Sequence, residues 1–265
     1  MRIFSEVVPG ISLLKVPFND GSYDTGVYLV QCGGQTALID SGECAATVDS
    51  CILPALEAAG VRSIDWLLCS HTHGDHAGGH ERLQEVLGCP TAVYEGDTVH
   101  FPVKPDRILR DGESAIPGLR LIATPGHMPG AVSFLHEESG TLITGDSFQG
   151  FGTDGVGLAL IENPVAYRAS IARILALRPL RMACGHGFAP CDFVIERPMR
   201  VQAFLQCCLD TLSRYEHFIA GHLELDDHEL ASRLVENEGR FLERYIVRGD
   251  STVTGCRKHA ETFPS

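Results

Sequence analysis

The stretch that decides the fold of this chain reads SHTHGDHAGG and spans residues 70–79. It places three histidines and one aspartate within six positions: His71, His73, Asp75 and His76. An apolar run at residues 66–69 precedes it, which predicts a buried strand leading directly into the cluster. Because so many ionisable side chains are costly in a core but useful on a loop that faces a cation, we interpret the stretch as a metal-binding loop.

The spacing within this loop predicts two ligand positions. His71 and His73 alternate by two residues, so their side chains point to the same side at the end of an extended strand. Asp75 and His76 come from the turn that follows and can face a second position. Imidazole nitrogens and carboxylate oxygens are ligands of a borderline cation such as zinc.

Three later loops supply further ligand candidates. His127 lies in TPGHMPG (residues 124–130), Asp146 in TGDS (144–147) and His186 in CGHG (184–187). Each follows a predicted strand and stands among glycine or proline turn residues. Taken singly, each could be an ordinary turn residue. Together with the first cluster, they complete a set of seven.

Predicted strands and helices alternate as far as about residue 187. We expect strands at residues 11–18, 26–32, 35–40, 66–70, 91–94, 119–123, 131–136, 141–144 and 181–184. We expect helices at residues 45–59, 79–87 and 164–177. Pro54 should kink or restart the first of these helices.

The pattern after Pro198 is helical. A capping box at Asp226 predicts the start of a last helix. The apolar residues of that helix are Leu230, Leu234, Phe241 and Tyr245. We expect the tail from Gly249 to be poorly ordered. The helices after Pro198 would either cap a pocket or form the interface of a homodimer.

The four motifs, in this order along the chain, resemble those of the metallo-β-lactamase superfamily over roughly residues 10–190. The resemblance implies an α/β fold, an αββα sandwich with the metal site at one edge of its two sheets. We expect this catalytic domain to span residues 1–197 and a C-terminal helical extension, packed on it, to span residues 198–265.

The resemblance also implies a role for each candidate residue. Two divalent ions are expected, zinc first, with iron or manganese as alternatives. The implied ligands are His71, His73 and His127 for the first ion, Asp75, His76 and His186 for the second, and Asp146 as a bridge. Asp40, in the segment LIDSG, matches a position that supports the site from behind, although a simple turn carboxylate is an equally open reading.

Two such ions would make a hydroxide available at neutral pH and polarise a carbonyl group. Asp75 would orient that hydroxide as the catalytic carboxylate. We therefore expect a metal-dependent hydrolase of an acyl bond in a small molecule, namely a thioester, an ester or a lactone. The glycine-rich residues 147–163 could line an acyl pocket or form an ordinary surface loop.

Departures from the family's branches narrow this expectation. True zinc β-lactamases carry Cys or Ser at the position of Asp146. The segment GHGFA, at residues 185–189, lacks the aromatic hydroxyl motif of glyoxalase II. Lactonases place a Tyr shortly after the bridging Asp, where this chain has Ser147 and Phe148. Tyr167 and Ser170, together with the C-terminal helices, are similar to acyl-thioesterase-like members involved in quinolone signalling.

Other function classes stay open. An iron-dependent oxidoreductase or dioxygenase of the same fold could use the same ligands, and so could a non-catalytic metal-binding signalling protein. The net charge of −13 disfavours a nucleic acid partner, and no apolar run approaches the roughly 18 residues of a membrane helix. Ten cysteines without a CxxC pair, and an opening segment without a secretory pattern, predict free thiols in a cytoplasmic protein.

Overall fold

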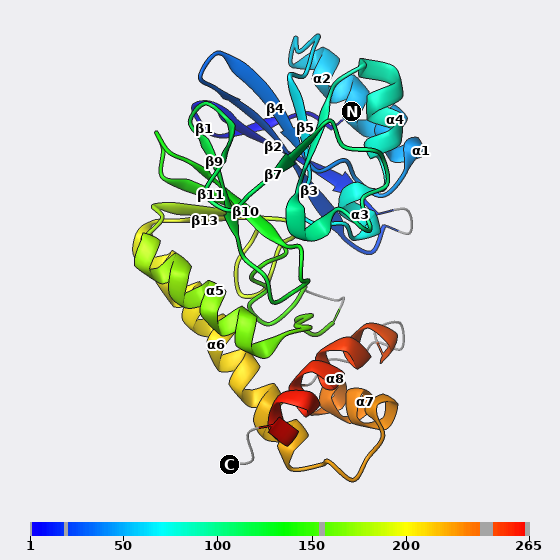
Figure 1. Cartoon of the computed structure of the whole chain (residues 1–265), viewed down its shortest axis with the longest axis vertical. Helices are drawn as coiled ribbons and strands as arrows, with labels where there is room; N and C mark the ends of the chain where they lie inside the picture. The colour runs from blue at the N-terminus through cyan, green and yellow to red at the C-terminus, as the bar shows by residue number, and fades with distance from the viewer. Residues whose placement is uncertain (1, 19–20, 154–156, 239–245, 263–265) are drawn as a thin grey trace.

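The computed structural model describes residues 2–18, 21–153, 157–238 and 246–262. Two β-sheets lie against each other, and helices cover the outer face of each sheet (Figure 1). This is the αββα sandwich expected from the sequence. Long helices follow the second sheet and carry the chain away from the sandwich (Figure 1).

The first sheet contains seven strands in sequence order. The first four pair antiparallel, whereas the fourth to seventh pair parallel. These strands are β1 (Ser5–Val8), β2 (Ile11–Pro17), β3 (Asp24–Cys32), β4 (Gln35–Ile39), β5 (Trp66–Leu68), β6 (Thr91–Tyr94) and β7 (Arg107–Leu109).

The second sheet contains six strands in the order β13-β12-β11-β10-β9-β8. Its neighbours are antiparallel except for β11 and β12, which run parallel. The strands are β8 (Ser114–Ile116), β9 (Leu119–Ala123), β10 (Val132–His136), β11 (Thr141–Gly145), β12 (Arg181–Cys184) and β13 (Val194–Glu196).

Alternation along the strands builds the layers. In β3, Tyr28 and Val30 pack between the two sheets, whereas Val27 and Leu29 pack outward under helices. In β11, Ile143 packs between the sheets, whereas Leu142 packs against the helices of the other outer face. Successive side chains of a strand point to opposite faces, so each sheet buries both of its faces.

The helices over the first sheet are α1 (Ala45–Thr47), η1 (Val48–Ile52), α2 (Leu53–Ala58) and α4 (His80–Leu87). The expected helix at residues 45–59 is therefore present, but it is divided. A π-helical segment, η1, leads into α2, which has Pro54 in its first turn. Proline has no N–H to donate to the preceding turn, which explains why the helix restarts there.

The helices over the second sheet are α5 (Pro164–Leu177) and the first part of α6 (Pro198–Ala220). Beyond the sheet, α7 (Asp227–Asn237) and α8 (Ile246–Thr262) pack against α6 and against each other (Figure 1). Leu230 and Leu234 are buried in α7 as predicted, whereas Phe241 and Tyr245 lie outside the described residues. The expectation of a poorly ordered tail from Gly249 is wrong as far as Thr262, and residues 263–265 lie outside the described residues. Thr252 and Val253 of α8 are fully buried, because α8 packs against α6 and α7.

Strand direction gathers the predicted ligands at one edge. Asp40 follows β4 and His71 follows β5, and these two strands run parallel. Asp146 follows β11 and His186 follows β12, the parallel pair of the other sheet. The carboxyl ends of parallel strands meet at the same edge, so residues distant in sequence become neighbours there.

Two broader expectations can be compared with the structure. All ten cysteines are free thiols. Within the described part of the chain, no helix is both long enough and apolar enough to cross a bilayer.

Candidate metal centre

The site is built on Asp40, a buried carboxylate directly after β4. Its Oδ1 accepts a hydrogen bond from the Ser70 N–H at 2.7 Å, and its Oδ2 accepts one from Ser70 Oγ at 2.7 Å. The same Oδ2 lies 2.8 Å from His76 Nδ1. Asp40 thus fixes both the start of the metal-binding loop, residues 70–79, and one of its imidazoles from behind.

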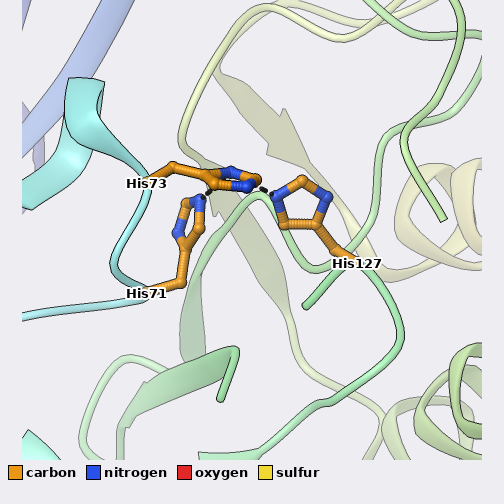
Figure 2. Close-up of side chains that lie close together, drawn as sticks. All are labelled: His71, His73 and His127. Carbon is orange, nitrogen blue, oxygen red and sulfur yellow. Dashed lines mark hydrogen bonds between the residues drawn. The ribbon is translucent and has the colours of Figure 1, made fainter. Parts of the chain in front are cut away.

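The first ligand group consists of His71, His73 and His127. His71 Nε2 and His127 Nε2 each lie 3.0 Å from His73 Nδ1. The three imidazoles point toward one another from two separate loops (Figure 2). His127 Nδ1 donates to the carbonyl oxygen of Leu160 at 2.9 Å, which leaves the Nε2 lone pair facing the group. Three nitrogens therefore surround one point.

The second ligand group consists of Asp75, His76 and His186. His76 Nε2 and His186 Nε2 lie 3.2 Å apart, and Asp75 Oδ2 lies 3.2 Å from His186 Nε2. Asp75 and His76 come from α3 (Gly74–Ala77), the helical turn within the loop. This turn directs Asp75 and His76 toward His186, the second position that the spacing predicted, while the His76 ring centroid stays 4.2 Å from the His71 ring centroid.

Asp146 lies between the two groups. Its Oδ1 is 3.3 Å from His76 Nε2, and its Oδ2 is 3.3 Å from His186 Nε2 and 4.0 Å from His127 Nε2. All seven predicted ligand residues therefore meet in one site. His71, His76 and Asp146 also form a set of donors close enough to hold an ion.

The two groups differ in charge. Burial lowers the pKa of His71 and His127, and it lowers the pKa of His73 to about 3. Burial acts in the same direction on His186, but the neighbouring carboxylates Asp146 and Asp75 outweigh it and raise the pKa of His186 to about 10. The first group thus offers neutral imidazoles, whereas the second shares protons among imidazoles and carboxylates.

The residues fit metal ions. Asp146 Oδ1 is buried and accepts no hydrogen bond from the residues that the structure describes, as expected of an oxygen reserved for a cation. A Cβ at Gly185 would lie 2.2 Å from Asp146 Oδ1 and 2.7 Å from His76 Cε1, so glycine keeps this space open. Imidazole and carboxylate donors suit zinc or iron.

A cavity opens beside the second group. It is lined by His73, Asp75, Asp146 and His186 and by Tyr23, Gln149, Thr153, Gly157, Leu158, Leu160 and Phe188. Gln149, Thr153, Gly157, Leu158 and Leu160 of the glycine-rich segment thus line the cavity, and the binding of an acyl group there stays a prediction. Within that segment Phe148 is a core residue, fully buried against α5 and its neighbours.

Two functional neighbours had no signal in the sequence. The Tyr23 hydroxyl lies 3.3 Å from Asp75 Oδ2, and its ring meets the His186 ring edge-on at 5.0 Å. Thr72 Oγ1 donates to the buried carboxylate of Asp97 at 2.9 Å, which ties down the loop between His71 and His73. A lone tyrosine and a lone aspartate in separate loops cannot be linked to the motifs by spacing.

The family follows from the sequence match as well as from the site. Residues 23–186 match the family model of the metallo-beta-lactamase superfamily. This chain belongs to the metallo-beta-lactamase superfamily. Its two ligand groups occupy the loops of the matched segment, and the helices α6, α7 and α8 follow it.

Named relatives of this superfamily member include hydrolases. A hydroxyacylglutathione hydrolase from Acidiphilium cryptum is 32% identical over 183 residues, which cover 68% of this chain and 70% of the relative. Lactamase-like protein vrtG from Penicillium aethiopicum is 30% identical over 185 residues, covering 68% of this chain and 56% of that protein. The chain is thus a member of a metallo-hydrolase superfamily with glyoxalase II-like homologues.

Two solved structures share the fold over nearly the whole length of this chain. A metallo-beta-lactamase family protein from Thermus thermophilus has a TM-score of 0.71 at 24% identity, covering 97% of this chain and 95% of that one. A beta-lactamase domain protein from Burkholderia ambifaria has a TM-score of 0.76 at 15% identity, covering 98% and 88%. At these identities the likeness is one of fold.

Proposed function

We propose that this protein is a binuclear metallo-hydrolase that cleaves an acyl bond in a small molecule, namely a thioester, an ester or a lactone. The observation that carries the proposal is the convergence of two three-residue ligand groups with Asp146 between them. In this proposal His71, His73 and His127 would hold the first ion, Asp75, His76 and His186 would hold the second, and Asp146 would be shared between them. Zinc is the preferred ion.

Two bound divalent cations would supply Lewis acidity and make a hydroxide available near pH 7. The chain itself orients the reacting groups. Asp75 borders the cavity with a carboxylate held by His186 and Tyr23, so it can direct a hydroxide and accept a proton. Leu158 and Phe188 supply apolar surface that excludes water from the acyl group.

Thioesters are the leading substrate class. The name of the hydroxyacylglutathione hydrolase relative specifies a glutathione thioester as its substrate. In this chain, the described lining of the cavity contains no Lys or Arg that would hold a carboxylate of a long anionic tail. We therefore place the uncharged acyl part of the substrate in the cavity and any charged leaving group outside it.

Asp146→Ala tests this proposal. Removing the shared carboxylate should abolish metal loading and lower turnover by more than about 100-fold, beyond the effect of losing an outer partner. Metal content by mass spectrometry and hydrolysis of acyl-CoA, glutathione thioester, aryl ester and lactone substrates would be measured on the same sample. The control is Asp49→Ala, which removes an exposed carboxylate paired with Arg82.

Three outcomes would count against the proposal. Full activity in Asp146→Ala would exclude the two-metal mechanism. A coloured, iron-loaded wild-type protein without hydrolase activity would instead favour an oxidoreductase. A metal-loaded wild-type protein that is inactive on the whole panel would favour a binding or signalling role.

A further inference from the structure

The cavity and the C-terminal helices share one short segment. Residues 158–162, here called the strap, separate the candidate metal centre from α6 and α8. Leu158 and Leu160 line the cavity. Ala159 and Ile161 are fully buried in the core that includes α5, α6, α7 and α8. The strap therefore has one face toward the site and one toward the helices.

Side-chain hydroxyls of the helices hold the outer edge of the strap. The Ala159 N–H donates to the Tyr215 hydroxyl at 3.1 Å, and the Ile161 N–H donates to Thr252 Oγ1 at 2.9 Å. Thr252 Oγ1 in turn donates to the Ala159 carbonyl oxygen at 3.4 Å. Tyr215 of α6 and Thr252 of α8 are both fully buried, so water cannot replace these bonds.

The inner edge of the strap is bonded to the metal side. The Leu160 N–H donates to Gln149 Oε1 at 2.8 Å, and the Leu160 carbonyl oxygen accepts from His127 Nδ1 at 2.9 Å. Alternate residues of the strap are thus tied to opposite neighbours. Hydrogen bonds on both edges of the strap therefore fix the distance between Leu158 and Leu160, which line the cavity, and the two ligand groups.

The packing of α8 leaves little freedom for the strap to shift outward. A Cβ at Gly255 would lie 2.2 Å from the Glu162 carbonyl oxygen, so the α8 backbone approaches the strap directly. On the cavity side, the Phe188 ring meets the His186 ring edge-on at 5.5 Å and closes the apolar surface. An alkyl or aryl group fits this uncharged wall better than a charged one.

We propose that the strap is the acyl-binding wall of the site, and that Tyr215 and Thr252 are positioning residues that determine which acyl chain lengths the site accepts. This inference rests on the proposed function for its substrate class. Loss of the Thr252 hydroxyl leaves the Ile161 N–H unsatisfied while the Leu160 bonds persist. The wall then loses its fixed position, although the metal ligands keep theirs.

Thr252→Val tests the inference because valine keeps the shape of threonine without its hydroxyl. Thr252→Ser is the conservative control, since it keeps the Oγ. Thr254→Val is the matched control on the same helix, because Thr254 Oγ1 donates to Asp227 and not to the strap. Leu158→Ala is a second variant that changes the wall directly and leaves the helix bonds intact.

Three measurements on the zinc-loaded protein are combined. The first is kcat/KM for 4-nitrophenyl esters of acetate, butanoate, hexanoate and octanoate. The second is calorimetric binding of the four corresponding carboxylates, which requires no turnover. The third is hydrogen exchange of the Ala159 and Ile161 amides, together with zinc content.

We expect Thr252→Val to lower the ratio between the best and worst chain lengths by about tenfold, in both kcat/KM and carboxylate affinity. Zinc content should not change, and the Ile161 amide should exchange faster. Thr252→Ser and Thr254→Val should keep the wild-type profile. Leu158→Ala should move the preference toward longer chains without faster exchange at Ile161.

The inference is overturned if Thr252→Val accelerates exchange at Ile161 while the chain-length profile stays the same. It is also overturned if wild-type carboxylate affinity does not depend on chain length, or if Thr252→Val weakens all chain lengths equally with loss of zinc. The wild-type protein could also hydrolyse no ester but bind carboxylates with a chain-length preference that Thr252→Val reduces. This result would reject the proposed function and support the assignment of the strap as the acyl-binding wall.

Discussion

Two segments face the same cavity and are held in opposite ways. The metal-binding loop at residues 70–79 is supported by buried ionisable groups: Asp40, which lies 30 and 36 residues from its partners Ser70 and His76, and His80, which follows the loop and bonds to Ser41. The strap is supported by the neutral hydroxyls of Tyr215 and Thr252, which lie 56 and 91 residues from their partners. The metal-binding loop and the outer edge of the strap thus have different supports, although the inner edge of the strap contacts the candidate ligand His127 through Leu160.

The largest expected effect is on the metal side alone. In Gly185→Ala, the added Cβ would meet Asp146 Oδ1 at 2.2 Å. The backbone cannot move away, because the Gly185 N–H and carbonyl are bonded to Gly145 and Gly26 at 2.8 and 2.7 Å. We expect loss of metal binding and activity, measured by metal analysis and turnover, while the Ile161 amide exchanges at the wild-type rate.

Gly187→Ala is the matched control for this variant. It makes the same substitution two residues later, where the nearest atom to the new Cβ lies at 3.4 Å. Metal content should stay at the wild-type level. Faster exchange at Ile161 in Gly185→Ala would show that the two supports are not independent.

A second effect concerns acid stability. His80 is fully buried, with Nδ1 2.7 Å from Ser41 Oγ, and burial lowers its pKa from the usual 6.5 to about 4. Between these two pH values His80 is protonated in the unfolded chain but neutral in the folded chain. The contribution of His80 to stability is therefore fully present above pH 6.5 and is lost as the pH falls toward 4. This difference corresponds to about 3 kcal/mol.

Urea unfolding of metal-free protein at pH 7, 6 and 5 would measure this effect. His80→Asn should be less stable than wild type at pH 7 but should lose less stability on acidification. Parallel losses in the two proteins would contradict the role given to His80. Thr252→Val, which changes only a neutral hydroxyl, should follow the wild-type slope.

A smaller effect is expected at Asp40, where asparagine tolerates the left-handed backbone with φ of 68°. Asp40→Asn replaces an acceptor that serves both Ser70 Oγ and His76 Nδ1. Outer partners of metal-binding histidines typically contribute 10–100-fold in affinity, so zinc affinity should fall by about that factor. A chelator competition assay would measure it.

Asp65→Asn is the control for this charge change, because Asp65 accepts a backbone hydrogen bond from Thr36 at an exposed position away from the site. The chain-length preference of Asp40→Asn should match that of wild type once zinc is restored. A changed chain-length preference would show that the support of the metal-binding loop also affects the position of the strap.

The same contrast explains which parts of the molecule could be predicted from the sequence. His71, His73, Asp75 and His76 stand together in one loop after an apolar strand, so local spacing was enough to identify them. His127, Asp146 and His186 each occupy a short glycine-containing motif after a strand. Parallel pairing of the strands then brings these motifs to one edge, a consequence of topology that the family resemblance supplied.

The residues that support the strap could not be predicted from motifs in the sequence. Tyr215 and Thr252 are single hydroxyl residues in helices, and no local pattern links them to Ala159 or Ile161. The segment after Gly249 is the end of the chain, which predicts poor order, and it is also rich in residues of low helix propensity. Tertiary burial of Val253 and neighbouring residues outweighs that propensity and makes α8 a helix.

The hydrogen bonds from α6 and α8 to the strap also bear on how such a protein can diversify. The superfamily match ends at residue 186, so both helices lie beyond the segment whose sequence defines the family. Mutations in these helices can reshape the apolar wall without touching a single metal-binding side chain. A lineage could therefore acquire new substrates through its appended C-terminal region while inheriting its chemistry unaltered.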